Sequence, residues 1–198
     1  MLRAFIAIQL SDDLKRQIER VQTDLKRQAS KLGGRGGLGW TRPEGIHLTL
    51  KFLGDIPETQ VEALGEVLRR AASTVEPFVL EARGVGAFPN LRKPRVLWLG
   101  LHGGEREMET LRRLYAAVEE GAAELDFPKE SRAFTPHLTL ARVRDSGPAG
   151  TLEQILAESQ DRVVGAWTAG AMSLIRSELR QNGTVYTTLV EVPLGGGV

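Results

Sequence analysis

The stretch His47-Leu48-Thr49-Leu50 returns unchanged as His137-Leu138-Thr139-Leu140 later in the same 198-residue chain. The chain has three histidines, and two of them open these two copies. A proline precedes each copy: Pro43 lies four residues before the first, and Pro136 lies directly before the second. Repetition of a rare residue inside an identical string indicates a duplicated functional element.

Each copy has the residue pattern of a strand. Side chains alternate between the two faces of a strand, so residues i and i+2 share a face about 6.6 Å apart. We therefore expect His47 and Thr49 to point one way while Leu48 and Leu50 point into a core. The second copy is expected to do the same, which would place an imidazole and a hydroxyl together on each of two rigid elements.

These side chains suit the cleavage of a phosphate ester. Histidine has an unperturbed pKa near 6.5, so one imidazole can donate a proton while the other removes one. Threonine hydroxyls can donate hydrogen bonds to non-bridging phosphate oxygens. If the two strands face each other, His47 and His137 form an acid–base pair, and Thr49 and Thr139 hold the phosphate between them.

A zinc site is the main alternative for a histidine pair. It is disfavoured because the chain contains no cysteine and neither strand offers an obvious third ligand, so we expect no metal and no cofactor. His102 precedes Gly103-Gly104 and is expected to be a turn residue at a strand end. The glycine run at 33–39 lacks the Gly-Lys-Ser/Thr ending of a phosphate loop and is expected to be a connector.

Composition limits the class of protein. With 41% hydrophobic residues, the chain can bury a real core and suits one domain over 1–198. The absence of cysteine excludes disulfides, thiolate nucleophiles and cysteine-based metal sites. No leader pattern opens the sequence, and no apolar run approaches the roughly 18 residues of a membrane span. We expect a soluble, cytoplasmic, monomeric protein with no membrane contact.

Charge is unevenly distributed although the net charge is only +1. Residues 1–51 hold ten Lys/Arg against five Asp/Glu, which gives +5. Residues 52–128 hold nine against thirteen, which gives −4, and 129–198 balance at seven each. The basic segment can steer a phosphate-bearing ligand. The alternative is that these cations are the solvated face of a helix.

Hydrophobic periodicity and turn residues define the elements. They predict strands over 5–8, 47–53, 78–87, 96–101, 137–143, 166–177 and 184–193, and helices over 12–31, 57–72, 105–125 and 151–160. Asn182-Gly183 is a strong hairpin signal between the last two strands. Strands often follow strands, which favours an α+β fold with largely antiparallel sheets. No GxGxxG follows the first strand, so a dinucleotide-binding fold has no support.

With these motifs the chain resembles the two-histidine phosphoesterases, and within them the bacterial and archaeal RNA 2′,3′-cyclic phosphodiesterases, once called 2′-5′ RNA ligases. The similarity spans nearly the full length. It is carried by four stretches, namely 3–8, 40–54, 134–142 and 174–179.

The resemblance implies a bilobal α+β fold of two pseudo-symmetric lobes. Each lobe has an antiparallel sheet flanked by helices, and the active site lies in the groove between them. The implied reaction is metal-independent hydrolysis of a 2′,3′-cyclic phosphate on an RNA end or nucleotide to a 2′-phosphate, with 2′-5′ RNA ligation as a second activity.

The resemblance also implies roles for residues. His47 is the proton donor to the departing 3′ oxygen, and His137 is the acceptor that activates water. Thr49 and Thr139 hold the phosphate oxygens, and Arg142 matches a phosphate-binding arginine. Simple alternation from His137 places Arg142 on the opposite face, so its role requires a bulge or a strand end.

Two further questions stay open from the sequence. The motifs do not separate an RNA end from another small cyclic phosphate, such as an ADP-ribose cyclic phosphate, or from a non-catalytic RNA-binding module. Stacking on aromatic side chains commonly holds single-stranded RNA. Candidate side chains for stacking are Phe5, Trp40, Phe134 and Tyr186, and the alternative for each is a place in the core.

Overall fold

The computed structural model of the chain describes residues 1–31, 37–144, 149–181 and 183–196. Its strands are β1 (Leu2–Gln9), β2 (Leu38–Trp40), β3 (His47–Ile56), β4 (Phe78–Phe88), β5 (Val96–His102), β6 (His137–Val143), β7 (Val163–Ala169), β8 (Ala171–Arg180) and β9 (Gly183–Pro193). Its α-helices are α1 (Asp12–Lys31), α2 (Val61–Ala72), α3 (Glu105–Ala123) and α4 (Ala149–Glu158). Short 3-10 turns cover Pro43–Gly45 and Glu58–Gln60.

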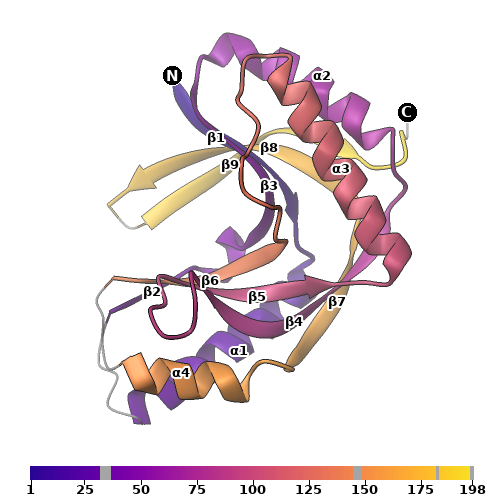
Figure 1. Ribbon diagram of the computed structural model, residues 1–198. Helices are drawn as coiled ribbons and strands as arrows, with labels where there is room; N and C mark the ends of the chain where they lie inside the picture. The colour runs from indigo at the N-terminus through magenta and orange to yellow at the C-terminus, as the bar shows by residue number, and fades with distance from the viewer. Residues whose placement is uncertain (32–36, 145–148, 182, 197–198) are drawn as a thin grey trace.

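The described strands form one continuous antiparallel sheet in the order β7-β4-β5-β6-β3-β1-β8-β9, with β2 paired to β6. The predicted α+β class with antiparallel pairing is therefore confirmed. The sheet curls, so that β4, β5 and β6 lie along the lower part of the view in Figure 1 while β1, β8 and β9 lie above them. The two halves meet where β3 adjoins β6, and the described residues place a single pair there, Leu48 with Leu138.

The two halves repeat one order of elements. The first run is β1-α1-β3-α2, the second is β5-α3-β6-α4, and in each run the second strand begins with a histidine. Two further strands complete each half, namely β8 and β9 beside β1, and β4 and β7 beside β5. This order is the one expected of two pseudo-symmetric units.

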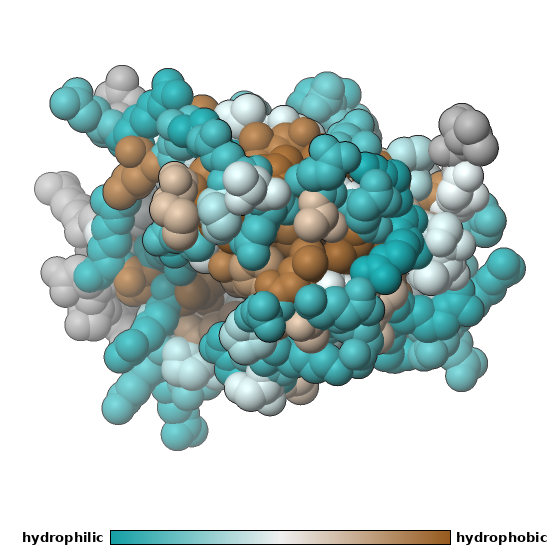
Figure 2. Space-filling model, turned by 90° about the horizontal axis from the view of Figure 1, so that it is seen from above, coloured by the Kyte–Doolittle hydropathy of each residue, from teal (hydrophilic) through white to brown (hydrophobic). Residues whose placement is uncertain are grey.

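Helices cover the sheet in two pairs. α1 packs against β7 and α4, whereas α2 packs against α3, β8 and β9 (Figure 1). The inward side of α1 is formed by Leu14, Ile18, Val21 and Leu25, which recur at helical spacing and are all buried. From above, hydrophilic side chains outline the molecule and apolar side chains come to the surface in the middle of that face (Figure 2).

The elements differ from the sequence prediction at three places. The strand predicted over 166–177 is two strands, β7 and β8, which separate at Gly170 and belong to different halves of the sheet. Strand β2 was not predicted, because Leu38 and Gly39 belong to the glycine run at 33–39 that was expected to be a connector; positions 33–36 of that run lie outside the described residues. The helix predicted from 57 begins with a 3-10 turn.

The predicted hairpin at the end of the chain is confirmed. β8 and β9 pair along their whole length, from Ala171 with Pro193 to Arg180 with Gly183. Asn182, the other half of the predicted turn, lies outside the described residues. Within the described ranges, no helix is both long and apolar enough to cross a membrane.

Candidate active site

The site is organised around the junction of β3 and β6. Leu48 and Leu138 pair directly there, and they are 1% and 0% exposed because both point into the core. Their neighbours along each strand must point to the other face. His47, Thr49, His137 and Thr139 are all half-buried on that face. Paired Cα atoms in antiparallel strands lie about 4.5–5.5 Å apart, so the junction brings the two predicted couples together.

Each imidazole is oriented by the backbone two residues upstream. Nδ1 of His137 donates a hydrogen bond to the carbonyl oxygen of Thr135, at 2.7 Å. The ring of His47 hydrogen-bonds to the backbone of Gly45. The bond at Nδ1 fixes the tautomer of neutral His137 and leaves Nε2 as the free proton acceptor. The segments that contain Pro43 and Pro136 therefore supply the carbonyls that hold the rings.

Two aromatic rings enclose His47. Phe5 of β1 stacks on it with ring centroids 4.5 Å apart, and Tyr186 of β9 meets it edge-on at 5.4 Å. Burial lowers the pKa of His47 from 6.5 to about 4, although the hydrogen bond to Gly45 opposes that shift. His47 is consequently neutral at pH 7 in the free protein.

A second aromatic wall borders His137. Phe88 of β4 meets its ring edge-on at 5.0 Å, and Trp98 of β5 lies 5.3 Å from Phe88. Trp98 pairs with Thr139, so it shares the face of the site. Nothing in the sequence marks Phe88 and Trp98 as site residues, because only the pairing of distant strands places them beside the second motif.

A β-bulge follows the His-x-Thr unit in both strands, at the same step. The pairing of β3 with β1 skips Leu50, and the pairing of β6 with β5 skips Leu140. An extra residue reverses the alternation of faces beyond it. The fifth residue after each histidine therefore shares the histidine's face, and these residues are Phe52 and Arg142.

The register supports this placement. Arg142 pairs with Val96 and Thr139 pairs with Trp98, and these two partners lie two residues apart on β5. The bulge that the role of Arg142 requires is therefore present. Phe52 occupies the matching position beside Phe5 and is 72% exposed. The site thus has an exposed guanidinium on one side and an exposed aromatic ring on the other.

The four aromatic candidates divide into two groups. Phe5 and Tyr186 lie at His47. Trp40 pairs with Ala141, which follows the bulge and faces away from the site, and the Lys26 ammonium lies 5.1 Å from the Trp40 ring centroid. Phe134 stacks on Tyr115 of α3, with ring centroids 4.0 Å apart.

The remaining sequence candidates are not part of this cluster. His102 is the exposed last residue of β5, as expected of a strand end. Cations of α1 pair with acids of the same helix, for example Lys15 with Asp12 and Arg27 with Asp24. Among the described residues, no group of three or more His, Cys, Asp or Glu side chains is placed to hold a metal ion.

A curled antiparallel sheet that joins two His-x-Thr strands defines a two-histidine phosphoesterase. The chain belongs to the LigT-like phosphoesterase family, because the sequence model of that family matches residues 8–98 and 104–186.

Relatives and solved structures agree with this membership. The chain is 34% identical over 188 residues to an RNA 2′,3′-cyclic phosphodiesterase of Methanothermobacter thermautotrophicus, covering 95% of this chain and 96% of the relative. It is 38% identical over 149 residues to that of Aeropyrum pernix, covering 75% and 82%. A crystal structure from Thermus thermophilus has a TM-score of 0.71 at 31% identity, covering 98% of this chain and 99% of its own. E. coli LigT complexed with 3′-AMP shares the fold, with a TM-score of 0.71 at 23% identity and 98% coverage of each chain.

Proposed function

We propose that this protein hydrolyses the 2′,3′-cyclic phosphate of an RNA end or nucleotide to a 2′-phosphate, without a metal ion. The observation that carries the proposal is the convergence of His47, Thr49, His137 and Thr139 on one face around the Leu48–Leu138 pair. The relatives named RNA 2′,3′-cyclic phosphodiesterase support the substrate class.

In the proposed reaction, water attacks phosphorus and the bond from phosphorus to O3′ breaks. We assign His137 as the base, the role that the family resemblance implies; its Nδ1 is engaged with the Thr135 carbonyl, which leaves Nε2 to take the proton of water. His47 is the acid that protonates O3′. The two threonine hydroxyls and the Arg142 guanidinium hold the non-bridging oxygens, where donors and positive charge stabilise the negative charge of the transition state.

The lowered pKa of His47 fits an acid that acquires its proton with the substrate. In the free protein, burial between Phe5 and Tyr186 favours the neutral ring. A phosphate anion at the site stabilises the imidazolium and raises the pKa of His47 again, because an opposite charge nearby favours the charged form. The proton is then available where O3′ departs.

The same groups support ligation as a second activity. When a 5′-hydroxyl takes the place of water, attack on the cyclic phosphate breaks the same bond to O3′ and leaves a 2′-5′ phosphodiester. No additional residue is needed, since His137 accepts the proton from either nucleophile. We further propose that the enzyme is a cytoplasmic monomer, which sedimentation at micromolar concentration tests for its oligomeric state.

Phosphorus NMR of a 2′,3′-cyclic nucleotide in EDTA tests the proposal. The wild-type protein is expected to give the 2′-phosphate, whereas His47→Ala and His137→Ala each lose about 10²–10⁴-fold in rate, the usual contribution of a general acid or base. A 3′-phosphate product, or activity that EDTA abolishes, contradicts the mechanism. An ADP-ribose cyclic phosphate in parallel tests the rival substrate, and binding without turnover would indicate a binding module. A 5′-hydroxyl oligonucleotide tests ligation.

A further inference from the structure

We propose that a basic strip beside His137 binds the backbone phosphates of an RNA strand upstream of its cyclic end, so that polynucleotide ends are favoured over mononucleotides. The inference rests on the proposed function and specifies its substrate. The strip begins at Arg142 of β6, which we place on the reacting phosphate, and continues with four other exposed cations, Arg144 directly after β6 and Arg92, Lys93 and Arg95 of the β4–β5 loop.

A glycine allows Arg144 to join Arg142 on the site face. Gly39 of β2 pairs with Arg142, so the missing side chain of Gly39 would project from the same face. A Cβ atom at Gly39 would lie 2.8 Å from Nε of Arg144. The guanidinium of Arg144 therefore occupies the space above Gly39, one step along the strand from Arg142.

The β4–β5 loop continues the strip from this point. The carbonyl oxygen of Arg95 accepts a hydrogen bond at 2.9 Å from the amide of Val143, the last residue of β6, which lies between Arg142 and Arg144 in the chain. The same loop begins at Phe88, whose ring contacts His137. The strip thus runs outward from the reacting phosphate and is continuous with the site.

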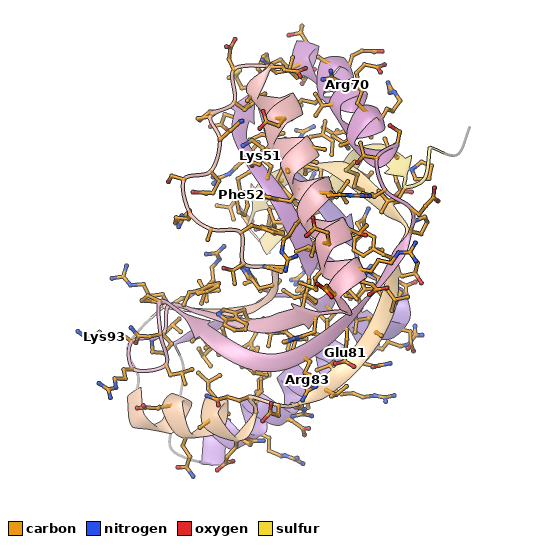
Figure 3. All side chains as sticks on the ribbon, turned by 45° about the vertical axis from the view of Figure 1, so that its right-hand side comes forward. Lys51, Phe52, Arg70, Glu81, Arg83 and Lys93 are labelled. Atoms are coloured by element: carbon orange, nitrogen blue, oxygen red, sulfur yellow. The ribbon has the colours of Figure 1, made fainter. Side chains whose placement is uncertain are left out.

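The loop has a defined shape. The amide of Arg95 donates to the Phe88 carbonyl at 2.7 Å and closes the loop. Oδ1 of Asn90 accepts from the amides of Arg92 and Lys93, at 3.1 and 3.0 Å. This turn holds both cations near the tip, where Lys93 lies at the outer edge of the molecule (Figure 3).

The charges of the strip are available to a ligand. None of its five cations forms an ion pair with any residue in the part of the chain that the structure describes. On the β8–β9 hairpin, by contrast, Arg176 and Arg180 both pair with Glu178, at 2.9 and 3.3 Å. Upstream phosphates, which carry one charge per nucleotide, are therefore expected to follow the strip and not the hairpin.

A comparison of two substrates tests the inference. Arg144→Ala, Gly39→Ala and the double variant Arg92→Ala/Lys93→Ala are assayed on cyclic CMP and on a ten-nucleotide RNA with a 2′,3′-cyclic end. We expect kcat/KM for the oligonucleotide to fall about tenfold, mainly through KM, with cyclic CMP unaffected. The slope of log kcat/KM against log salt should flatten by about 1 for each phosphate that the variant no longer binds. Arg69→Ala on α2, which removes a cation paired with Glu66, is the matched control.

Binding is measured separately from turnover, by fluorescence anisotropy with a labelled ten-nucleotide RNA ending in a 2′-phosphate. The strip variants should bind it about tenfold more weakly than Arg69→Ala does. An equal loss on both substrates, or binding that matches the control, would overturn the inference. If wild-type protein fails to hydrolyse cyclic CMP but the binding difference remains, the proposed reaction fails and the strip stands.

Discussion

Nζ of Lys51 lies 2.9 Å from Oε1 of Glu119, in the interior between β3 and α3, and the two residues are 5% and 6% exposed. Lys51 also donates to the carbonyl of Pro128, and Oε2 of Glu119 accepts from the amide of Glu130, both at 2.9 Å. The bulge at Leu50 turns Lys51 inward. The pair therefore ties the strand of His47 to the segment that leads into the strand of His137.

We expect the loss of either partner to be costly, because it leaves the other charge buried without compensation. Lys51→Met or Glu119→Gln should lower the free energy of unfolding by about 3–5 kcal/mol in urea titrations. The double variant Lys51→Met/Glu119→Met should lose clearly less than the sum of the single variants. Additive losses would show that the two charges are not coupled. Arg70→Ala, which breaks the exposed pair with Glu124, is the control and should cost at most about 1 kcal/mol.

The buried position of His47 predicts a pH dependence. Its pKa is about 4 in the folded protein and 6.5 in the unfolded chain, so the unfolded state binds the proton more tightly. Stability from this group is complete above pH 6.5 and is lost as the pH falls towards 4. The free energy of unfolding should therefore decrease over that range, and less steeply in His47→Asn. Histidine ring NMR should show His47 titrating well below neutrality, and titration near pH 6.5 would contradict the prediction.

Tyr186 offers a direct test of the cause of that shift. Tyr186→Ala removes the edge contact at 5.4 Å and admits water to the ring, so the pKa of His47 should rise towards 6.5. Tyr186→Phe keeps the ring and should leave the pKa near 4. The measurement is again histidine NMR in the free protein. Equal pKa values in the two variants would assign the burial to Phe5 alone.

The sequence predicted the two couples because strand alternation is a local rule. Half-buried His47 and Thr49 alternate with buried leucines, as do His137 and Thr139. The bulges were beyond the sequence, because a bulge is defined by the partner strand, and so Phe52 escaped notice. The break between β7 and β8 at Gly170 was missed for a similar reason. The apolar pattern runs on from β7 into β8, and only the strand pairing shows that the two strands belong to different halves of the sheet.

Gly86 is expected to be intolerant of a side chain. A Cβ atom there would lie 2.3 Å from Cζ2 of Trp98, whose ring contacts Phe88 beside His137. Gly86→Ala should reduce the free energy of unfolding by about 1–3 kcal/mol through overpacking, and should also lower kcat. Gly170→Ala is the matched control, because no atom lies within 4 Å of its added methyl group. Equal losses of unfolding free energy in Gly86→Ala and Gly170→Ala would show that the Trp98 ring moves aside without cost.

Phe52 is expected to act on the substrate and not on stability. Phe52→Ala should change the free energy of unfolding by no more than about 0.5 kcal/mol, because the ring is 72% exposed. Stacking of a base on an aromatic ring contributes about 1–3 kcal/mol, so KM for a cyclic nucleotide should rise about tenfold. Val163→Ala on β7, where the side chain is 57% exposed, should leave KM unchanged. An unaltered KM in Phe52→Ala would place the base elsewhere.

The Leu48–Leu138 pair also makes the chemistry inseparable from correct folding. A shift of β3 or β6 by one residue relative to its neighbours would bury the histidine of that strand in the hydrophobic core and expose a leucine in its place. Such a slipped molecule would be unstable and inert at once. The register that buries both leucines is thus the same register that presents both imidazoles, so correct folding and a complete site are acquired together.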